Sequence, residues 1–373
     1  MLRHRAARQI CRNTPGRVVP NINLLVMPIN KRSNDMKASE SILDAIGHTP
    51  LVKINRLLGE GHVANIYAKL EFMNPGGSIK DRLVKHLVKR MQESGELTQD
   101  SVLVENSSGN TGAALSMVAA AHGLRCIVTI PDKMSREKIS RMRAYGTQVV
   151  VAPTAVDAAD PRSYYSVARQ IASTTPHAIY PDQYNNPLNA EAHYMSTGPE
   201  IWEQTEGEID VLVSGIGTGG TISGIGRYLK ERNPNVQIIG VDPIGSVFYE
   251  YFHHRRLSTP HTYQVEGIGE DYLVKAVDFS VIDDIVQVDD RESFVMARRL
   301  VREEGILCGG SSGSAMSVAT RISARYPGKN IVVILPDSGN MYLSKFLDDD
   351  WMRANGYAVD TDHRTRATDE VAA

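Results

Sequence analysis

Short apolar runs alternate with amphipathic stretches along most of this chain. The runs have the length and the β-branched content of buried strands, which we predict at Asn65–Leu70, Val102–Glu105, Arg125–Ile130, Gln148–Val151, Asp210–Ser214, Gln237–Val241, Ile285–Val288 and Asn330–Leu335. Stretches of helical period separate them, and the predicted helices include Lys80–Ser94, Ala113–Ala121, Ser135–Tyr145, Arg162–Thr174, Arg291–Glu304 and Ser314–Arg325. Because this alternation is typical of parallel βαβ units, the pattern predicts an α/β fold.

Seven small or amide residues, 106–112 (Asn-Ser-Ser-Gly-Asn-Thr-Gly), follow one predicted strand and precede a helix. A helix start needs one such residue as a cap. A whole stretch of them offers backbone N–H groups, hydroxyls and the positive end of the helix dipole to an anion. We interpret it as an anion site, for a substrate carboxylate.

Lys80 follows a Pro-Gly-Gly turn and opens an amphipathic stretch. In α/β proteins ligands bind at such junctions, outside the carboxyl ends of the strands. Lysine can form a Schiff base with an aldehyde cofactor when burial or neighbours lower its pKa. A lysine at a helix start is more often a solvated charge, so this interpretation depends on the neighbouring motifs.

Residues 214–221 (Ser-Gly-Ile-Gly-Thr-Gly-Gly-Thr) lie between a predicted strand and a helix that ends near Arg232. Glycines there let the backbone approach a phosphate, and threonine hydroxyls add hydrogen bonds. Gly215, Gly217 and Gly220 also satisfy the dinucleotide pattern G-x-G-x-x-G, and Asp242 follows about 20 residues later, where a ribose-binding acid is expected. Taken singly, this segment favours a nicotinamide oxidoreductase.

Four motifs in chain order change that interpretation. They are 76–82 (Gly-Gly-Ser-Ile-Lys-Asp-Arg), 107–112, 217–221 and 308–313 (Cys-Gly-Gly-Ser-Ser-Gly). Together with the opening 46–52 (Ile-Gly-His-Thr-Pro-Leu-Val), they resemble the tryptophan-synthase-β-like family of pyridoxal-phosphate enzymes, of fold type II. Within it the chain is most similar to the cystathionine β-synthase and cysteine synthase branch, over residues 39–357.

The resemblance implies two three-layer α/β/α domains with mostly parallel sheets and the cofactor in the cleft between them. The larger domain would comprise residues 38–80 and 187–357, and 81–186 would form a smaller inserted domain. Residues 1–37 contain eight Lys or Arg and one acid, Asp35, so they are interpreted as a disordered or targeting-like arm. Residues 358–373 form a polar tail.

The resemblance also assigns roles to residues. Lys80 would bind the cofactor aldehyde and act as the general base at the substrate α-carbon. The phosphate would lie against the loop of Gly217, Thr218, Gly219, Gly220 and Thr221, and Asn110 would contact the ring hydroxyl. The substrate would contact Ser107, Ser108, Gly109, Thr111, Gln183, Tyr184, Gly267 and Gly269.

Ser311 would face the pyridine nitrogen. An Asp there stabilises a pyridinium and delocalises the carbanion into the ring, whereas a hydroxyl cannot hold that proton. Charge then stays near the α-carbon, which favours loss of a β-leaving group followed by addition of a thiol. The alternative is that Ser311 only caps the helix that follows.

The implied reaction is serine plus homocysteine to cystathionine. Segments 335–338 and 345–352 resemble cystathionine β-synthases, whereas 197–202 is more similar to cysteine synthases, so an O-acetylserine-dependent cysteine synthase is the alternative. Cysteine formation from serine or O-acetylserine plus sulfide is left open as a side reaction. Glu270 stands where the compared synthases usually carry Tyr, which leaves the handling of the second substrate open. A catalytically dead scaffold is disfavoured because Lys80, Asn110 and Ser311 are all present.

Composition adds mainly exclusions. A net charge of −2 gives no reason to expect nucleic-acid or membrane partners, and small molecules and a homodimer or homotetramer are expected instead. Three cysteines, Cys11, Cys126 and Cys308, form no metal or disulfide spacing, which favours a reducing, cytoplasmic compartment; the Arg-rich arm leaves a mitochondrial one open. Cys11 has no suitably placed His partner, so we expect no haem and no metal.

Overall fold

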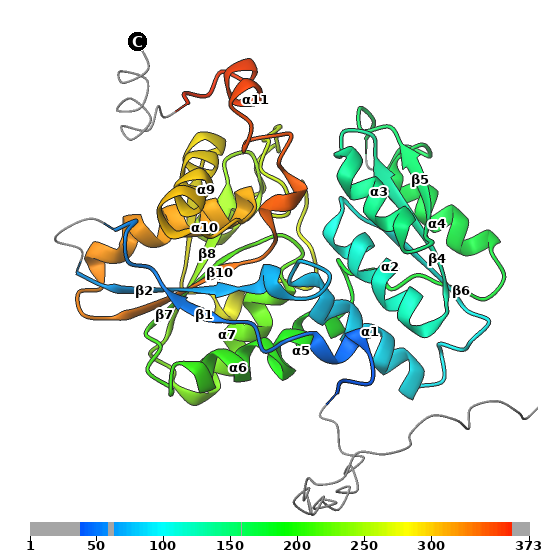
Figure 1. The fold of residues 1–373 in the computed structure, drawn as a ribbon, viewed down its shortest axis with the longest axis horizontal. Helices are drawn as coiled ribbons and strands as arrows, with labels where there is room; N and C mark the ends of the chain where they lie inside the picture. The colour runs from blue at the N-terminus through cyan, green and yellow to red at the C-terminus, as the bar shows by residue number, and fades with distance from the viewer. Residues whose placement is uncertain (1–37, 59–62, 158, 360–373) are drawn as a thin grey trace, which may run out of the picture. The chain divides into compact units, whose positions relative to one another are not determined.

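The computed structural model describes residues 38–58, 63–157 and 159–359. These residues form two β-sheets with helices on their faces (Figure 1). The predicted arm 1–37, with Cys11, and the tail from residue 360 lie outside the described residues.

The larger sheet has six strands in the order β1-β2-β10-β7-β8-β9. Their bounds are β1 Leu51–Lys53, β2 Asn65–Leu70, β10 Asn330–Leu335, β7 Val211–Gly215, β8 Gln237–Pro243 and β9 Asp284–Val288. Only the pairing of β1 with β2 is antiparallel. Strand β10 is buried over its last five residues, as expected for a central strand covered by helices on both faces.

The smaller sheet has four strands in the order β5-β4-β3-β6, all parallel. Their bounds are β5 Gln148–Ala152, β4 Arg125–Pro131, β3 Val102–Asn106 and β6 Ala178–Ile179. All five residues of β3 are buried. This sheet therefore has a core of its own, which its central strands share with the helices packed on them.

Helices cover both sheets. Their bounds are α1 Lys80–Glu93, α2 Asn110–His122, α3 Arg136–Ala144, α4 Tyr164–Thr174, α5 Leu188–Met195, α6 Thr197–Gln204, α7 Gly220–Arg232, α8 Phe248–His254, α9 Asp290–Glu304, α10 Gly310–Ile322 and α11 Asp349–Ala354. Figure 1 shows α9 and α10 on one face of the six-stranded sheet and α6 and α7 on the other. Local signals place several ends: Ser135 and Ser163 cap α3 and α4, and Gly305 ends α9 in a left-handed conformation.

The predicted α/β class with mostly parallel sheets is confirmed. Every predicted strand is present, although β1 and β6 were not predicted. Helices α5, α6, α8 and α11 were not predicted either. The predicted division into domains 38–80 plus 187–357 and 81–186 stays a prediction.

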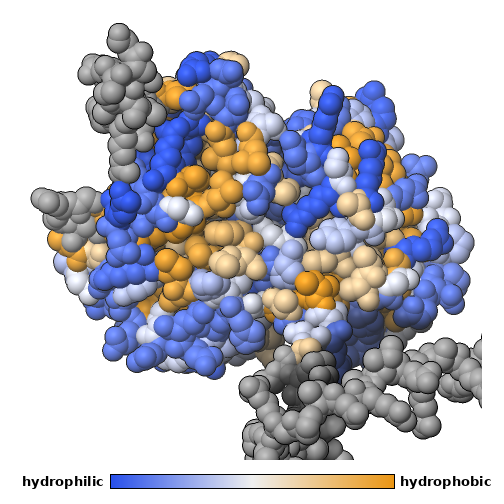
Figure 2. All heavy atoms as spheres, viewed as in Figure 1, coloured by the Kyte–Doolittle hydropathy of each residue, from blue (hydrophilic) through white to orange (hydrophobic). Residues whose placement is uncertain are grey.

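Hydrophobic side chains appear in patches among hydrophilic ones on the face shown in Figure 2, as is usual for folded proteins. None of the helices in the described ranges is both long and apolar enough to cross a membrane. Within the same ranges, no group of three or more His, Cys, Asp or Glu side chains is arranged to hold a metal ion.

Candidate functional site

Three segments far apart in the sequence meet around Lys80. The backbone N–H of Ile79 donates to the carbonyl oxygen of Pro336 at 2.8 Å. Farther along, the N–H of Gly309 donates to the carbonyl oxygen of Asp337 at 3.0 Å. The turn before α1, the start of α10 and the segment after β10 therefore lie side by side, and Lys80 is the first residue of α1.

The Lys80 side chain is half-buried, and its pKa is lowered from the ordinary value. Desolvation is the main cause, while the carboxyl groups of Asp337 and Glu270 oppose it. A lowered pKa leaves a larger fraction of the amine uncharged at neutral pH, which a nucleophile or general base needs.

The predicted anion loop lies at the start of α2. The Ser107 hydroxyl is buried and accepts hydrogen bonds from the backbone N–H groups of Gly109, at 3.0 Å, and Gly112, at 2.9 Å. Ser108 is half-buried beside them. The hydroxyl of Ser107 thus holds the loop at the positive end of the helix.

Two further contacts connect this loop to distant segments. The hydroxyl of Thr111 donates to the side-chain oxygen of Gln183 at 2.6 Å, and Tyr184 is buried next to Gln183. The amide of Asn110 donates to Asp337 at 2.8 Å. The structure therefore brings these predicted residues together at one end of α2.

From the sequence, Asp337 was noted only within the segment 335–338, but in the structure this residue contacts several parts of the candidate site. It is buried, it accepts hydrogen bonds from Asn110 and from the hydroxyl of Tyr342 at 2.7 Å, and its second oxygen has no hydrogen-bond partner within the described residues. Burial raises its pKa, while the hydrogen bond from Asn110 opposes that shift. Asn110 lies 227 residues before Asp337, so no local pattern predicts the contact between them.

The glycine loop 217–221 forms the start of α7. A Cβ at Gly217 would lie 2.8 Å from the carbonyl oxygen of Gly267, and one at Gly219 would lie 2.1 Å from Val277. Gly219 also has a positive φ of 83°. Only glycine fits at these positions, and the loop ends with the first N–H groups of a 13-residue helix, including that of Gly220.

Ser311 is the second residue of α10 and is only 2% exposed. Its hydroxyl lies 4.0 Å from the position a Cβ would take on Gly267. The N–H of Gly269 donates to the carbonyl oxygen of Ile216 at 2.6 Å. The loop with Gly267 and Gly269 therefore connects Ser311 to the glycine loop.

The same loop carries an ionic contact that the sequence did not indicate. The Glu266 carboxylate contacts the ammonium groups of Lys138 on α3 and Lys345 before α11. Burial opposes ionisation, but the two lysines lower the pKa of Glu266 overall.

The dinucleotide interpretation finds no support in the geometry. Asp242 is fully buried, and one of its oxygens accepts the N–H of Tyr249 at 2.9 Å, within the first turn of α8. The carboxylate therefore binds a backbone N–H in the first turn of α8, a structural role that does not require a ribose.

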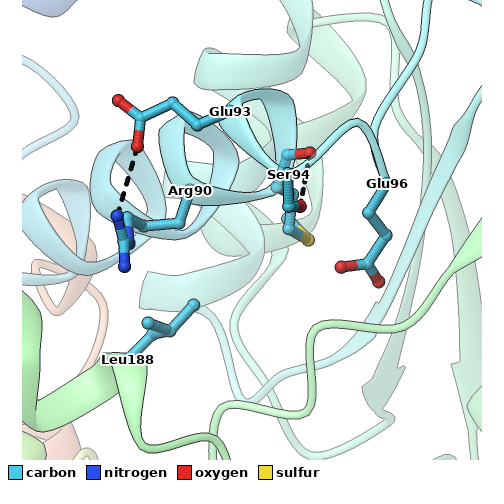
Figure 3. A pocket seen from close by; sticks show the side chains of 6 residues that line it. Arg90, Glu93, Ser94, Glu96 and Leu188 are labelled. Atoms are coloured by element: carbon cyan, nitrogen blue, oxygen red, sulfur yellow. Dashed lines mark hydrogen bonds and ion pairs between the residues drawn. The ribbon is translucent and has the colours of Figure 1, made fainter.

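A separate hollow of about 350 Å³ lies at the end of α1 (Figure 3). Its lining residues are Arg90, Met91, Glu93, Ser94, Glu96 and Leu188. Arg90 pairs with Glu93 at 3.3 Å, so these two charges satisfy one another. None of the predicted site residues lines this hollow.

Comparisons with known proteins agree with this geometry. Residues 42–337 match the family described as pyridoxal-phosphate dependent enzymes. A cystathionine beta-synthase from Apis mellifera is 45% identical over 88% of this chain and 65% of its own length. One from Dictyostelium discoideum is 43% identical over 89% of this chain and 66% of its own. The chain thus spans slightly less than two thirds of these curated relatives.

A solved structure extends the comparison to the fold. The O-acetylserine dependent cystathionine beta-synthase from Helicobacter pylori is 36% identical, with a TM-score of 0.75, over 83% of this chain and 99% of that one. The sequence match and the shared fold lead to one conclusion. The chain belongs to the family of pyridoxal-phosphate dependent enzymes.

Proposed function

We propose that this protein catalyses a β-replacement in which L-serine and L-homocysteine form L-cystathionine and water. The main support is Lys80, a half-buried lysine of lowered pKa that opens α1 next to the segment 336–337, which contacts the starts of α2 and α10. The relatives named cystathionine beta-synthase support the choice of reaction, because they match most of this chain at more than 40% identity.

The residues present fit the cofactor. The glycine loop has no room for Cβ atoms and ends at a helix N-terminus, as a phosphate site requires. Asp337 has a buried oxygen without a partner within the described residues, and it lies close enough to Lys80 that its charge opposes the lowering of the lysine pKa. We assign the phosphate to 217–221, the aldehyde to Lys80, the ring hydroxyl to Asn110 and the ring nitrogen to Ser311.

The cofactor, when bound, withdraws electrons from the substrate α-carbon. The protein's residues do the rest. The uncharged Lys80 amine takes the α-proton, and the N–H groups of Ser108, Asn110 and Thr111 at the start of α2 bind the substrate carboxylate. Ser311 offers a hydroxyl, which cannot stabilise a pyridinium as a carboxylate would.

The second candidate is an O-acetylserine-dependent reaction, with homocysteine or with sulfide. The specific observation in its favour is the Helicobacter pylori relative, whose function is O-acetylserine dependent. Burial, and then the charge of Asp271, raise the pKa of Glu270 to about 8, and the charge of Lys80 opposes that shift, which places Glu270 near Lys80. A homo-oligomeric assembly remains part of the proposal.

One assay separates these candidates. The purified holoenzyme is given serine or O-acetylserine, each with homocysteine or sulfide, and kcat/KM is measured for all four pairs. We expect the highest value for serine with homocysteine. A highest value with O-acetylserine would favour the second candidate, and the absence of turnover with all four pairs would contradict both.

A further inference from the structure

Helix α5, which the sequence did not predict, packs tightly on the start of α7. A Cβ at Gly220 would lie 2.0 Å from the side-chain oxygen of Asn189, and one at Gly224 would lie 2.1 Å from the carbonyl oxygen of Ala190. Because position 220 is glycine, the side chain of Asn189 reaches the loop 217–221, and because position 224 is glycine, the backbone of α5 packs directly on α7.

Asn189 makes the first of these contacts. Its side chain is 1% exposed, and its amide donates to the hydroxyl of Thr218 at 3.0 Å and to the carbonyl oxygen of Gln183 at 2.8 Å. The side chain of Gln183 accepts from Thr111. A chain of hydrogen bonds therefore runs from the start of α2 through α5 to the glycine loop.

His193 lies one turn after Asn189 on the same face of α5. Its side chain is fully buried between two hydroxyls, with Nδ1 at 2.9 Å from Thr197 Oγ1 and Nε2 at 3.2 Å from Thr221 Oγ1. Burial, and then the positive charge of Lys80, lower its pKa well below the ordinary value. The ring is therefore neutral at physiological pH and carries a proton on one nitrogen only.

The position of that proton decides what Thr221 can do. If Nε2 carries it, the ring donates to Thr221, and the threonine keeps its own proton for an anion at the loop. If Nδ1 carries it, Thr221 must donate to the ring and has no proton left to offer. A helix N-terminus with a donating hydroxyl binds a phosphate better than one whose hydroxyl is already committed.

We infer that His193 is a positioning residue for the cofactor phosphate: its Nε2–H donates to Thr221, its Nδ1 accepts from Thr197, and the Thr221 hydroxyl is thereby directed to the phosphate. This rests on the proposed assignment of 217–221 as the phosphate loop. Phosphate binding would then depend on one tautomer of a buried histidine on α5, which the motif of the loop does not indicate.

The test compares two ligands that differ only in the phosphate. Full-length protein freed of cofactor is titrated with pyridoxal phosphate and with pyridoxal, and the ratio of the two dissociation constants is measured for each variant. Because both ligands meet the same fold in the same variant, a general loss of stability cancels in this ratio.

Matched variants separate the two nitrogens of the ring. Glutamine places an amide near the position of Nε2, and asparagine places one near Nδ1. We expect His193→Asn to lower the preference for the phosphorylated ligand about tenfold, the effect of one hydrogen bond to a charged group, and His193→Gln to stay near wild type. Thr221→Val should lower the preference as much as His193→Asn, with no further loss in the double variant.

The outcomes are distinguishable. If Thr221→Val leaves the ratio unchanged, the phosphate assignment of the loop fails, and the proposed function loses that support. If Thr221→Val lowers the ratio but His193→Asn does not, or if Asn and Gln at position 193 act alike, the inference about His193 is wrong. Should the His193 variants not fold, Thr197→Val must lower the ratio, and an unchanged ratio there overturns the inference.

Discussion

Lys80 is the first residue of α1 and also the proposed site of cofactor attachment, and one substitution can test the second role without disturbing the first. Alanine is a good helix former, so Lys80→Ala should leave the start of α1 intact. We expect it to remove the borohydride-reducible bond to the cofactor and to lower turnover by at least about 10²–10⁴-fold, the usual contribution of a general base. Mass spectrometry of the reduced peptide and a turnover assay measure the two effects.

Lys85 provides the matched control. It lies on the same helix, is also half-buried, and donates to the carbonyl oxygen of Leu43 at 2.7 Å. Lys85→Ala should keep both the reducible bond and the rate. A Lys80→Ala protein that is still reduced by borohydride and turns over normally would contradict the assignment of Lys80.

Ser311 allows an electronic argument to be tested. Ser311→Asp should retain the cofactor but lose roughly 10²-fold or more in the rate of serine elimination, because a carboxylate would hold a proton on the ring nitrogen. Elimination rates and the thermal midpoint with and without cofactor are the measurements. Because position 311 is 2% exposed, an Asp there is buried without a partner when the cofactor is absent, which lowers stability. The ring nitrogen of the bound cofactor would supply that partner, so we expect the cofactor to raise the thermal midpoint more in Ser311→Asp than in wild type.

Ser311→Ala is the comparison variant, because it removes the hydroxyl without adding charge. It should eliminate serine faster than Ser311→Asp. If Ser311→Asp matches the wild-type rate, the electronic argument is wrong, and Ser311 serves only the start of α10.

Residues inside contiguous motifs could be identified from the sequence, whereas their partners could not. Ser107, Asn110 and the glycine loop stand in runs whose composition is unusual over a few positions. Asp337 and His193 are single polar residues that act on motifs far away in the chain. Their roles depend on which elements the fold brings together, and spacing along the sequence does not carry that information.

At the scale of elements, the sequence predicted the long helices and strands but not the short ones. The long strands and helices were predicted because their apolar period extends over several residues. Helices α5 and α6 meet at Ser196, whose dihedral angles are not helical, so each has only eight residues in which to show a period. Strands β1 and β6 have three and two residues, too few for an alternating pattern.

A buried ion network connects β2, α1 and α6 beside Lys80. Lys69 of β2 is 0% exposed and contacts Glu200 of α6, which also pairs with Arg82 of α1 at 2.9 Å. Arg82 in turn pairs with Glu71, directly after β2, at 2.7 Å. Burial opposes ionisation of Glu200, but Arg82 and Lys69 lower its pKa to about 2.

Glu200→Gln should therefore destabilise the fold strongly. The change leaves Lys69 buried without its carboxylate, and loss of one partner of a buried pair costs about 3–5 kcal/mol. We expect the free energy of unfolding in urea to fall by that amount. Glu93→Gln, which removes an exposed partner of Arg90, should have little effect, as is usual for surface pairs. Equal effects of the two substitutions would contradict a structural role for the network.

At the scale of the whole molecule, the two sheets are connected through the candidate site. Asn110 at the start of α2 contacts Asp337 after β10, and Lys138 of α3 contacts Glu266 in the loop that carries Gly267 and Gly269. Each pair joins a residue next to the four-stranded sheet with one next to the six-stranded sheet. We therefore expect a substitution that weakens these contacts to lower both the stability of the fold and the activity of the candidate site.

The last prediction concerns Glu266, which contacts both Lys138 and Lys345. Its pKa is lowered, so the contribution of its charge is fully present above the ordinary glutamate value of 4.5 and is lost as the pH falls through the lower folded value. Glu266→Gln should lower the free energy of unfolding by about 1.5–3 kcal/mol at pH 7, the worth of a hydrogen bond to a charged group. The difference from wild type should shrink below pH 4.5, where the wild-type carboxylate itself takes up a proton.

Urea unfolding of the holoenzyme at several pH values between 3 and 7 measures this difference. Glu203→Gln, at an exposed position on α6, is the control and should match wild type throughout. A difference between Glu266→Gln and wild type that stays constant from pH 7 to pH 3 would mean that the effect comes from the shape of the side chain. A difference in unfolding free energy that shrinks toward pH 3 would show that the contact between the two sheets depends on the charge of Glu266, which is next to Gly267 and the site around Ser311.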